Sequence, residues 1–331
     1  MLLCMVFFSC SKESSNPQQE IAQDFKALVM GGKSIDPTHT WSTASNTSVS
    51  VSVSLDAGST YTIFLTLSDP TTDTNAKYVG MAKIKSGETK TIYATLPPSN
   101  SSLYATCYNG IGNAICLPVE NQKVTFDSSH TNDFAENATE PTGNYMFYAF
   151  EFPGNNAIRD FDYNDLILRI SIPEDNGDGT YTSHVDIVAI GSDMSVYVLY
   201  NGQEFGDEVH TSMGIAKSSQ INTSSFTRKP RRHGDLTFVG NDMSLNLGCL
   251  PFTLRVEKSD GTSSNYTQQV GEPPLFVAIN GDENGLWYYP REGANIGLAY
   301  LLFSTWANNQ QSATTWYDSS NASKSYIITW E

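Results

Sequence analysis

Residues 48–55 alternate strictly between serine and an apolar side chain, from Ser48 to Leu55. Neighbouring side chains of a β-strand point to opposite faces of its sheet. The alternation therefore predicts a strand with one buried face and one solvated face. It is where regular periodicity begins in the chain, and it favours a fold built from packed sheets.

Short apolar runs follow this strand at regular intervals, separated by turn clusters at 56–58 and 85–87. Such spacing is typical of an immunoglobulin-like β-sandwich, which we expect over residues 40–127. The further strands are expected at 61–67, 78–84, 89–96 and 103–108. Residues 128–143 are polar and show no pattern, and we interpret them as a linker.

A second set of apolar runs begins at Tyr145 and predicts a larger, jelly-roll-like β-sandwich over residues 144–331. One helix is expected near the C-terminus, where Asn295 can cap a run of apolar residues at helical spacing. Those residues are Ile296, Ala299, Tyr300, Phe303 and Trp306. The predicted fold class is thus all-β, with two β-sandwich domains.

An apolar run opens the chain and ends at Ser9, directly before Cys10. It is too short to span a bilayer as a helix, which needs about 20 residues. Its length is that of a signal peptide, and a small residue before a cysteine is typical of the cleavage site of bacterial lipoproteins. We expect residues 1–9 to be removed, Cys10 to carry lipid, and residues 10–39 to form a polar tether and lead-in. The basic start of a signal peptide is missing, which indicates a true start upstream.

The expected anchor implies an exported protein at the outer membrane or cell surface, held to the membrane by lipid. Lys12 and Glu13, close behind Cys10, resemble the surface-export signal of Bacteroidetes lipoproteins. The chain has 19 lysines and arginines against 35 aspartates and glutamates, a net charge of −16. Such acidity repels phosphate backbones, so no nucleic-acid partner is expected, and it favours the binding of cations.

Cys107 and Cys116 flank a stretch with Asn-Gly and Gly-Asn pairs, which are typical of a hairpin tip. A hairpin can bring the two sulfur atoms together, and an exported chain permits a disulfide. We therefore hypothesise a disulfide between them. Cys249 is expected to be a small buried hydrophobic residue.

The densest group of acids lies just before an apolar strand, at residues 159–167. Hard cations such as Ca²⁺ take about 6–8 oxygen ligands from carboxylates, amides and backbone carbonyls. Packing these acids without a cation would cost repulsion and raise their pKa values. A calcium site is therefore predicted, with Glu151 on the preceding strand as a further ligand; the alternative is that the acids cap turns and face water. The predicted ligands are Asp160, Asp162, Asn164, Asp165 and Glu151.

Four motifs in this order resemble the LruC-domain family of bacterial lipoproteins, over residues 140–331. The first joins Tyr148–Glu151 to Asp160–Leu166, and the second is Glu208–His210 with Gly214 and 221–223. The last two lie at 287–292 and at 299–307 with 316–317. The family usually has an acid where this chain has Phe152. The resemblance implies a surface or outer-membrane lipoprotein and brings no established activity.

We expect a non-enzymatic, calcium-stabilised module for adhesion or binding of a glycan or a protein. One alternative is a fimbrial or surface-assembly subunit that pairs through an edge strand. Another is a glycan hydrolase that uses the acids at 160–165, although no Gly-x-Ser-x-Gly or His-Glu-x-x-His motif is present. Five aromatic residues are expected either to pack in the core or to stack on sugar rings: Trp287, Tyr288, Tyr289, Trp316 and Tyr317.

Overall fold

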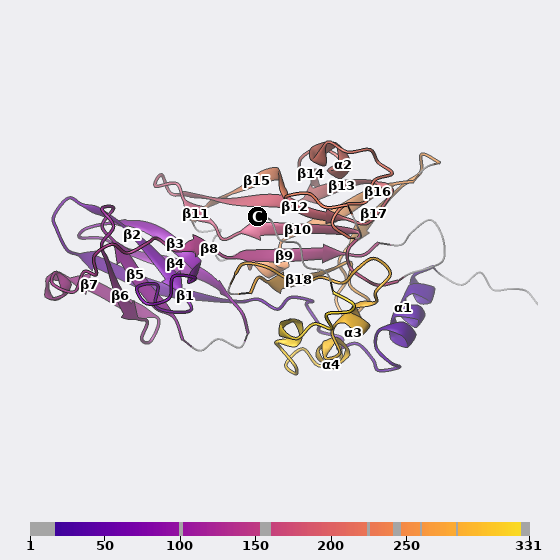
Figure 1. The fold of residues 1–331 in the computed structure, drawn as a ribbon, viewed down its shortest axis with the longest axis horizontal. Coiled ribbons are helices and arrows are strands. Elements are labelled where there is room, and N and C mark those ends of the chain that lie inside the picture. Colours follow the sequence, from indigo (N-terminus) through magenta and orange to yellow (C-terminus); the bar gives the residue numbers. More distant parts are fainter. Residues whose placement is uncertain are drawn as a thin grey trace, which may run out of the picture.

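The structure is a computed structural model that describes residues 17–98, 102–152, 160–223, 226–240, 246–258, 260–282 and 284–325. It contains two β-sandwiches that lie next to each other, with helices against one side of the second (Figure 1). The predicted all-β sandwich fold is confirmed.

The first sandwich packs a three-stranded sheet against a five-stranded sheet. The three-stranded sheet has the order β4 (Thr89–Leu96), β1 (Ser45–Ser54) and β7 (Lys123–Asp127). The order in the other is β6 (Ala114–Pro118), β5 (Tyr104–Tyr108), β2 (Thr60–Thr66), β3 (Lys77–Lys85) and β8 (Thr142–Gly143). The alternating segment is β1, and Val49, Val51 and Val53 point into the core between the sheets.

The segment interpreted as a linker lies along the first sandwich. It contains the short 3-10 helix η1 (Ser128–His130), and Ala135 forms a bridge with Ala114. Its end, β8, pairs in parallel with β3. Backbone hydrogen bonds thus hold this polar stretch, although its sequence shows no strand pattern.

The hairpin at residues 107–116 forms as expected, but the disulfide does not. Cys107 lies opposite Ile115 in the β5–β6 register, and Cys116 lies opposite Thr106. This offset of one residue puts the two side chains on opposite faces of the sheet, so both cysteines remain free thiols. Cys249 is exposed rather than buried.

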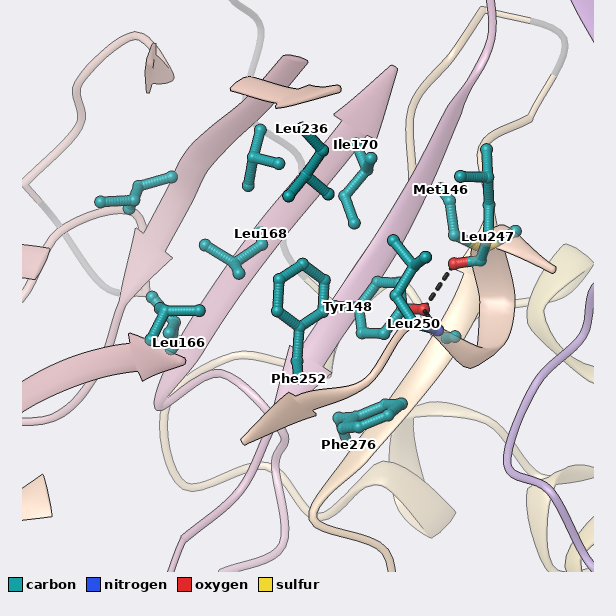
Figure 2. Packing of buried hydrophobic residues seen from close by; sticks show 14 of the residues in the cluster. Met146, Tyr148, Leu166, Leu168, Ile170, Leu236, Leu247, Leu250, Phe252 and Phe276 are labelled. Atoms are coloured by element: carbon teal, nitrogen blue, oxygen red, sulfur yellow. Dashed lines mark hydrogen bonds between the residues drawn. The ribbon is translucent and has the colours of Figure 1, made fainter. Parts of the chain in front are cut away.

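The second sandwich packs a six-stranded sheet against a four-stranded sheet. The larger sheet runs β11 (Glu174–Asp175), β12 (Thr180–Ile190), β10 (Leu166–Ser171), β9 (Tyr145–Phe150) and β18 (Phe276–Asn280), with β15 (Arg231–Val239) beside β12. The smaller runs β14 (Gln203–Glu204), β13 (Ser195–Tyr200), β16 (Phe252–Glu257) and β17 (Ser263–Thr267). Helix α2 (Val209–Met213) and the 3-10 helix η3 (Leu247–Cys249) join strands of this domain. The core between the sheets includes Tyr148, Leu168 and Phe252 (Figure 2).

A helical layer covers the outer face of the larger sheet, which the sequence patterns had not indicated. It consists of α1 (Pro17–Leu28), α3 (Ile296–Ala299), α4 (Phe303–Asn308) and the 3-10 helix η4 (Trp316–Asp318). Side chains from this layer form a second core with Phe147 and Ala149 of β9. Helix α1 also takes in residues 17–20, which were expected to belong to the flexible tether.

The single helix expected near the C-terminus is divided into α3 and α4. Asn295 caps α3 as expected, because its side chain accepts a hydrogen bond from the amide of Gly297 at 2.7 Å. Tyr300 then adopts an extended backbone (φ −135°, ψ 96°) and donates its hydroxyl to the carbonyl of Tyr288. The five predicted apolar residues are all buried, so their inward direction is confirmed although the helix is not continuous.

The two sandwiches meet through both apolar and polar contacts. Phe64, Tyr78 and Met81 of the first sandwich belong to the same buried cluster as the core of the second. Beside them, the carboxylate of Asp175 accepts the amide of Lys83 at 2.8 Å and lies 3.5 Å from the Nζ atom of Lys90. These contacts fix the interface on which the cleft described below depends.

A buried tyrosine links β9 to η3 and offers a test of this core. The Tyr148 hydroxyl donates to the carbonyl of Leu247 at 2.5 Å and accepts the amide of Leu250 at 2.7 Å (Figure 2). Tyr148→Phe leaves both partners buried and unsatisfied, so we expect the free energy of unfolding to fall by about 1–3 kcal/mol. Urea unfolding measures this change, and equal stability of the two proteins would contradict it.

Candidate cation site and inter-domain cleft

The acidic segment lies between β9 and β10, at the end of the sheet where both strands meet the helical layer. Glu151 follows β9 directly, and residues 160–165 lead into β10. Carboxylate oxygens of Glu151, Asp160 and Asp162 all lie within 4.8 Å of one another. Three of the five predicted ligands therefore converge, although eight residues lie between Glu151 and Asp160 in the sequence.

The backbone of this segment is unusual. Phe161 and Tyr163 both have positive φ angles, 53° and 55°, which cost non-glycine residues about 1–3 kcal/mol each. Burial of both rings and hydrogen bonds to Glu151 hold this conformation. The Oε1 atom of Glu151 accepts the amide of Phe161 at 3.2 Å, and its Oε2 atom accepts the amide of Tyr163 at 3.0 Å.

Further hydrogen bonds connect the acids to neighbouring segments. Asp162 accepts the amide of Asn164 at 3.2 Å and the amide of Gly293 at 2.7 Å. Asp165 accepts the amide of Phe152 at 2.8 Å. Each carboxylate oxygen keeps a further lone pair after accepting one hydrogen bond, so these contacts leave capacity for a cation.

Asp165 is not among the three converging acids, and Asn164 precedes it in the sequence. The Nδ2 atom of Asn164 donates to the carbonyl of Pro290 at 3.2 Å. This hydrogen bond connects the acidic loop to residues 287–292, which we call the closing segment. Sequence reasoning missed Glu292 of that segment: burial is the main cause that raises the pKa values of Asp162 and Asp165, and repulsion from Glu292 adds to it. Glu292 is the last residue of the motif at 287–292, and its place in that motif was the signal that could have pointed to it.

The acids hold protons unusually tightly. Burial, followed by repulsion from Asp165 and Asp162, raises the pKa of Glu151 well above its usual range. Burial is also the main cause for Asp165, with repulsion from Asp160 and Glu292, and its pKa rises to about 8. Across the described part of the chain, the ion pairs of lysine and arginine involve other acids. The electrostatics of the cluster thus favour added positive charge.

Two other motifs have structural roles. Glu208 caps α2, and its carboxylate lies 2.6 Å from the Nδ1 atom of buried His210, whose Nε2 atom lies 3.1 Å from the carbonyl of Ser192. Residues 175–179 form the turn between β11 and β12, where Asp178 accepts the amide of Thr180 at 2.9 Å. This second acid-rich stretch is a hairpin turn, as its Asn-Gly and Asp-Gly pairs indicate.

The five aromatic residues divide between two environments. Trp287, Tyr289 and Trp316 are buried in the second core of the C-terminal domain. Tyr288 and Tyr317 are only partly buried, and they line a cleft of about 490 Å³ between the two sandwiches. Trp287 also contributes to the lining of this cleft.

Polar side chains from both domains line the rest of the cleft. Asp73 and Lys77 come from the first sandwich, and Asp282 and Asp318 from the second. Lys77 donates to the hydroxyl of Thr142 at 2.6 Å. Burial and repulsion from Asp282 raise the pKa of Asp318. The lining is thus acidic, with aromatic and amide groups next to the carboxylates.

A second hollow of about 620 Å³ lies between α1 and the end of β17. Tyr266, Gln269 and Glu272 line one side, and Ile21 of α1 lines the other. Glu151 and Phe161 also contribute to its wall, so it borders the acidic cluster.

No protein-family model and no curated protein matches the chain. Among solved structures, the crystal structure of a "Putative lipoprotein from Bacteroides ovatus" is similar with a TM-score of 0.46 and 10% identity, over 83% of this chain and 100% of that one. This similarity is too low to transfer the description of that protein to this chain. In the described residues, no helix is long and apolar enough to cross a membrane, and Cys10 lies outside those residues.

The raised pKa values predict how stability changes with pH when calcium is absent. A carboxyl whose pKa is higher in the folded state stabilises the fold below the unfolded pKa, and this contribution is lost as pH rises through the folded pKa. For Asp165 that window runs from 3.8 to about 8. We therefore expect the free energy of unfolding in EDTA to fall as pH rises through this window.

The informative part of the window lies above pH 6.5. Burial lowers the pKa of His39 from 6.5 to about 4, so this residue acts in the opposite direction at lower pH. Unfolded histidine is half protonated at its usual pKa of 6.5, so the contribution of His39 fades above this pH, and urea unfolding in EDTA toward about pH 8 reports on the acids. Stability that rises with pH in this range would contradict the prediction.

Proposed function

We propose that this chain is a non-enzymatic, lipid-anchored surface protein whose second sandwich is braced by calcium and which binds a glycan. The observation that carries the calcium is the convergence of Glu151, Asp160 and Asp162 within 4.8 Å. Carboxylates at this separation repel one another, and a divalent cation removes the repulsion while using oxygen ligands that Ca²⁺ prefers. The lipid anchor on Cys10 rests on the sequence alone.

Calcium should raise the melting temperature of the protein. A ligand that binds only the folded state stabilises it by about 2.7 kcal/mol at 100 times its dissociation constant. Thermal unfolding in calcium and in EDTA measures the shift. Because calcium displaces protons from acids with raised pKa values, the shift should grow with pH.

Asp160→Asn is the informative variant for this site. It removes one negative charge from the cluster, so we expect a smaller calcium shift without a loss of stability in EDTA. Asp178→Asn is the matched control, since Asp178 lies in the other acid-rich turn and is exposed. The proposed calcium site would be contradicted if calcium did not raise the melting temperature of the wild type, or raised it equally in wild type and Asp160→Asn.

The inter-domain cleft supports the binding of a glycan. Its volume is within the range of small-molecule sites, which is about 300–1,000 Å³. The partly buried rings of Tyr288 and Tyr317 offer apolar surface, and carboxylates such as Asp282 accept hydrogen bonds from hydroxyl groups. The acidic lining disfavours anionic sugars, so an uncharged glycan is the expected ligand.

Binding to neutral oligosaccharides can locate this site. Tyr288→Ala should weaken binding roughly tenfold, because a stacking surface is lost. Tyr266→Ala is the control, since Tyr266 lines the second hollow. Glycan-array screening followed by calorimetry provides the measurement. Weaker binding in Tyr266→Ala alone would place the ligand in that hollow. Binding of acidic sugars only would exclude the cleft as the binding site.

A surface-assembly subunit is the second candidate, and β17 favours it. Among the described strands, β17 pairs with β16 only, and its residues are exposed or partly exposed. An open strand edge can accept a strand from a neighbouring molecule. Concentration-dependent polymers in light scattering would support this role over a monomeric binder. Turnover of a glycan that Asp165→Asn abolishes would instead support the hydrolase.

A further inference from the structure

Four exposed leucines gather where α1 meets the α3–α4 segment. The exposed fractions are 58% for Leu28, 53% for Leu298, 74% for Leu301 and 50% for Leu302. We call these four residues the leucine surface. The other large apolar residues that are exposed in the described chain lie apart in the sequence, on different segments: Ile111, Phe226, Val239 and Val270.

Backbone contacts bring the two parts of the leucine surface together. The carbonyl oxygen of Val29, next to Leu28, lies 2.9 Å from where a β-carbon on Gly297 would be. Farther along, the side chain of Asn308 donates to the carbonyl of Ser34 at 2.7 Å. Figure 1 shows α1 beside α3, and both contribute to one buried cluster.

The outward direction of Leu301 and Leu302 follows from how their neighbours pack. Tyr300 and Phe303 are both fully buried, and they fill the space between the helical layer and the sheet. The two leucines between them therefore face away from the core. Full burial of a leucine side chain stabilises by about 1.5–3 kcal/mol. Several exposed leucines side by side are therefore unfavourable in water, and a partner that buries them gains this free energy.

We propose that the leucine surface lies on the lipid bilayer that holds the anchor. This inference rests on the lipidation of Cys10 in the proposed function. Pro17, where α1 begins, is seven positions after Cys10, and seven residue steps extend at most about 25 Å. A helix of twelve residues adds about 18 Å. The anchor thus keeps α1 and the leucine surface within reach of the bilayer.

Charge near the leucine surface agrees with this partner. Lys26 and Lys33 are both exposed and lie on either side of Leu28 in the sequence, in a chain with a net charge of −16. Lysines beside apolar residues suit an interface of anionic headgroups and acyl chains. A lipid anchor combined with such a surface provides two membrane signals, which together hold a protein more stably than one.

Contact with the bilayer would also orient the molecule. The first sandwich lies at the opposite end of the long axis from α1 (Figure 1). A bilayer at the leucine surface would therefore leave the first sandwich facing the solution.

Fluorescence quenching by brominated lipid tests the leucine surface directly. The lipidated full chain is reconstituted into vesicles of phosphatidylethanolamine and phosphatidylglycerol, with and without bromine on the acyl chains. Leu301→Trp should lose more fluorescence to brominated lipid than the wild type does. Ile111→Trp is the matched control, because Ile111 is 80% exposed on the distant hairpin of the first sandwich, and it should show no extra loss.

A second variant guards against an effect of the new indole. Adding Leu298→Ser and Leu302→Ser to Leu301→Trp should reduce the quenching, while leaving the melting temperature unchanged because both leucines are exposed. Chains that float with vesicles yet show equal quenching of Leu301→Trp and Ile111→Trp would overturn the bilayer contact and leave the anchor intact. Chains that fail to float, with Cys10→Ser behaving identically, would overturn both the anchor and the contact.

Discussion

Strand β9 is buried on both faces, and the layers of the second domain are organised around it. Tyr148 and Phe150 point into the core between the two sheets, and Phe147 and Ala149 point into the core beneath the helices. It pairs with β10 on one side and with β18, the last strand of the larger sheet, on the other. Since neither face meets water, the strand is an unbroken apolar run. Glu151 follows this run directly, so the acidic cluster begins where burial on both faces ends.

The acidic loop is also the junction between the sheet and the helical layer. The carbonyl of Phe161 accepts the amide of Ile296 at 2.9 Å, at the first residue of α3. The ring of Phe161 packs against Phe25 of α1, with centroids 5.3 Å apart and planes at 78°. The positive φ angle of Phe161 makes both contacts possible while Asp160 and Asp162 turn toward Glu151. One strained loop therefore gathers the charges and attaches the helices.

Local patterns in the sequence predicted elements well where one face meets water and poorly where neither does. The serines and valines of β1 specify both the strand and its buried face. The run at β9 shows no alternation, so nothing in it distinguishes a two-layer sandwich from a sheet with a third layer. Contacts between distant segments could not be predicted either, because local patterns carry no information on strand register or on how the chain folds back. The offset between Cys107 and Cys116 depends on register, and the approach of Glu292 to Asp165 depends on how the closing segment folds back.

The junction gives a physical reason to connect the acidic cluster with the leucine surface. Burial and repulsion from the neighbouring carboxylates raise the pKa of Glu151, which accepts the amide of Phe161, and Phe161 contacts both α1 and α3. We infer that protons or a cation, by reducing this repulsion, would favour the arrangement in which Phe161 holds α1 and α3. Leu28 and Leu298 lie on or beside those same helices, so a bilayer that binds the leucine surface favours the attached arrangement as well. Two ligands that stabilise one conformation strengthen each other's binding by the same factor, so cation binding and membrane contact would be reciprocally coupled in this domain.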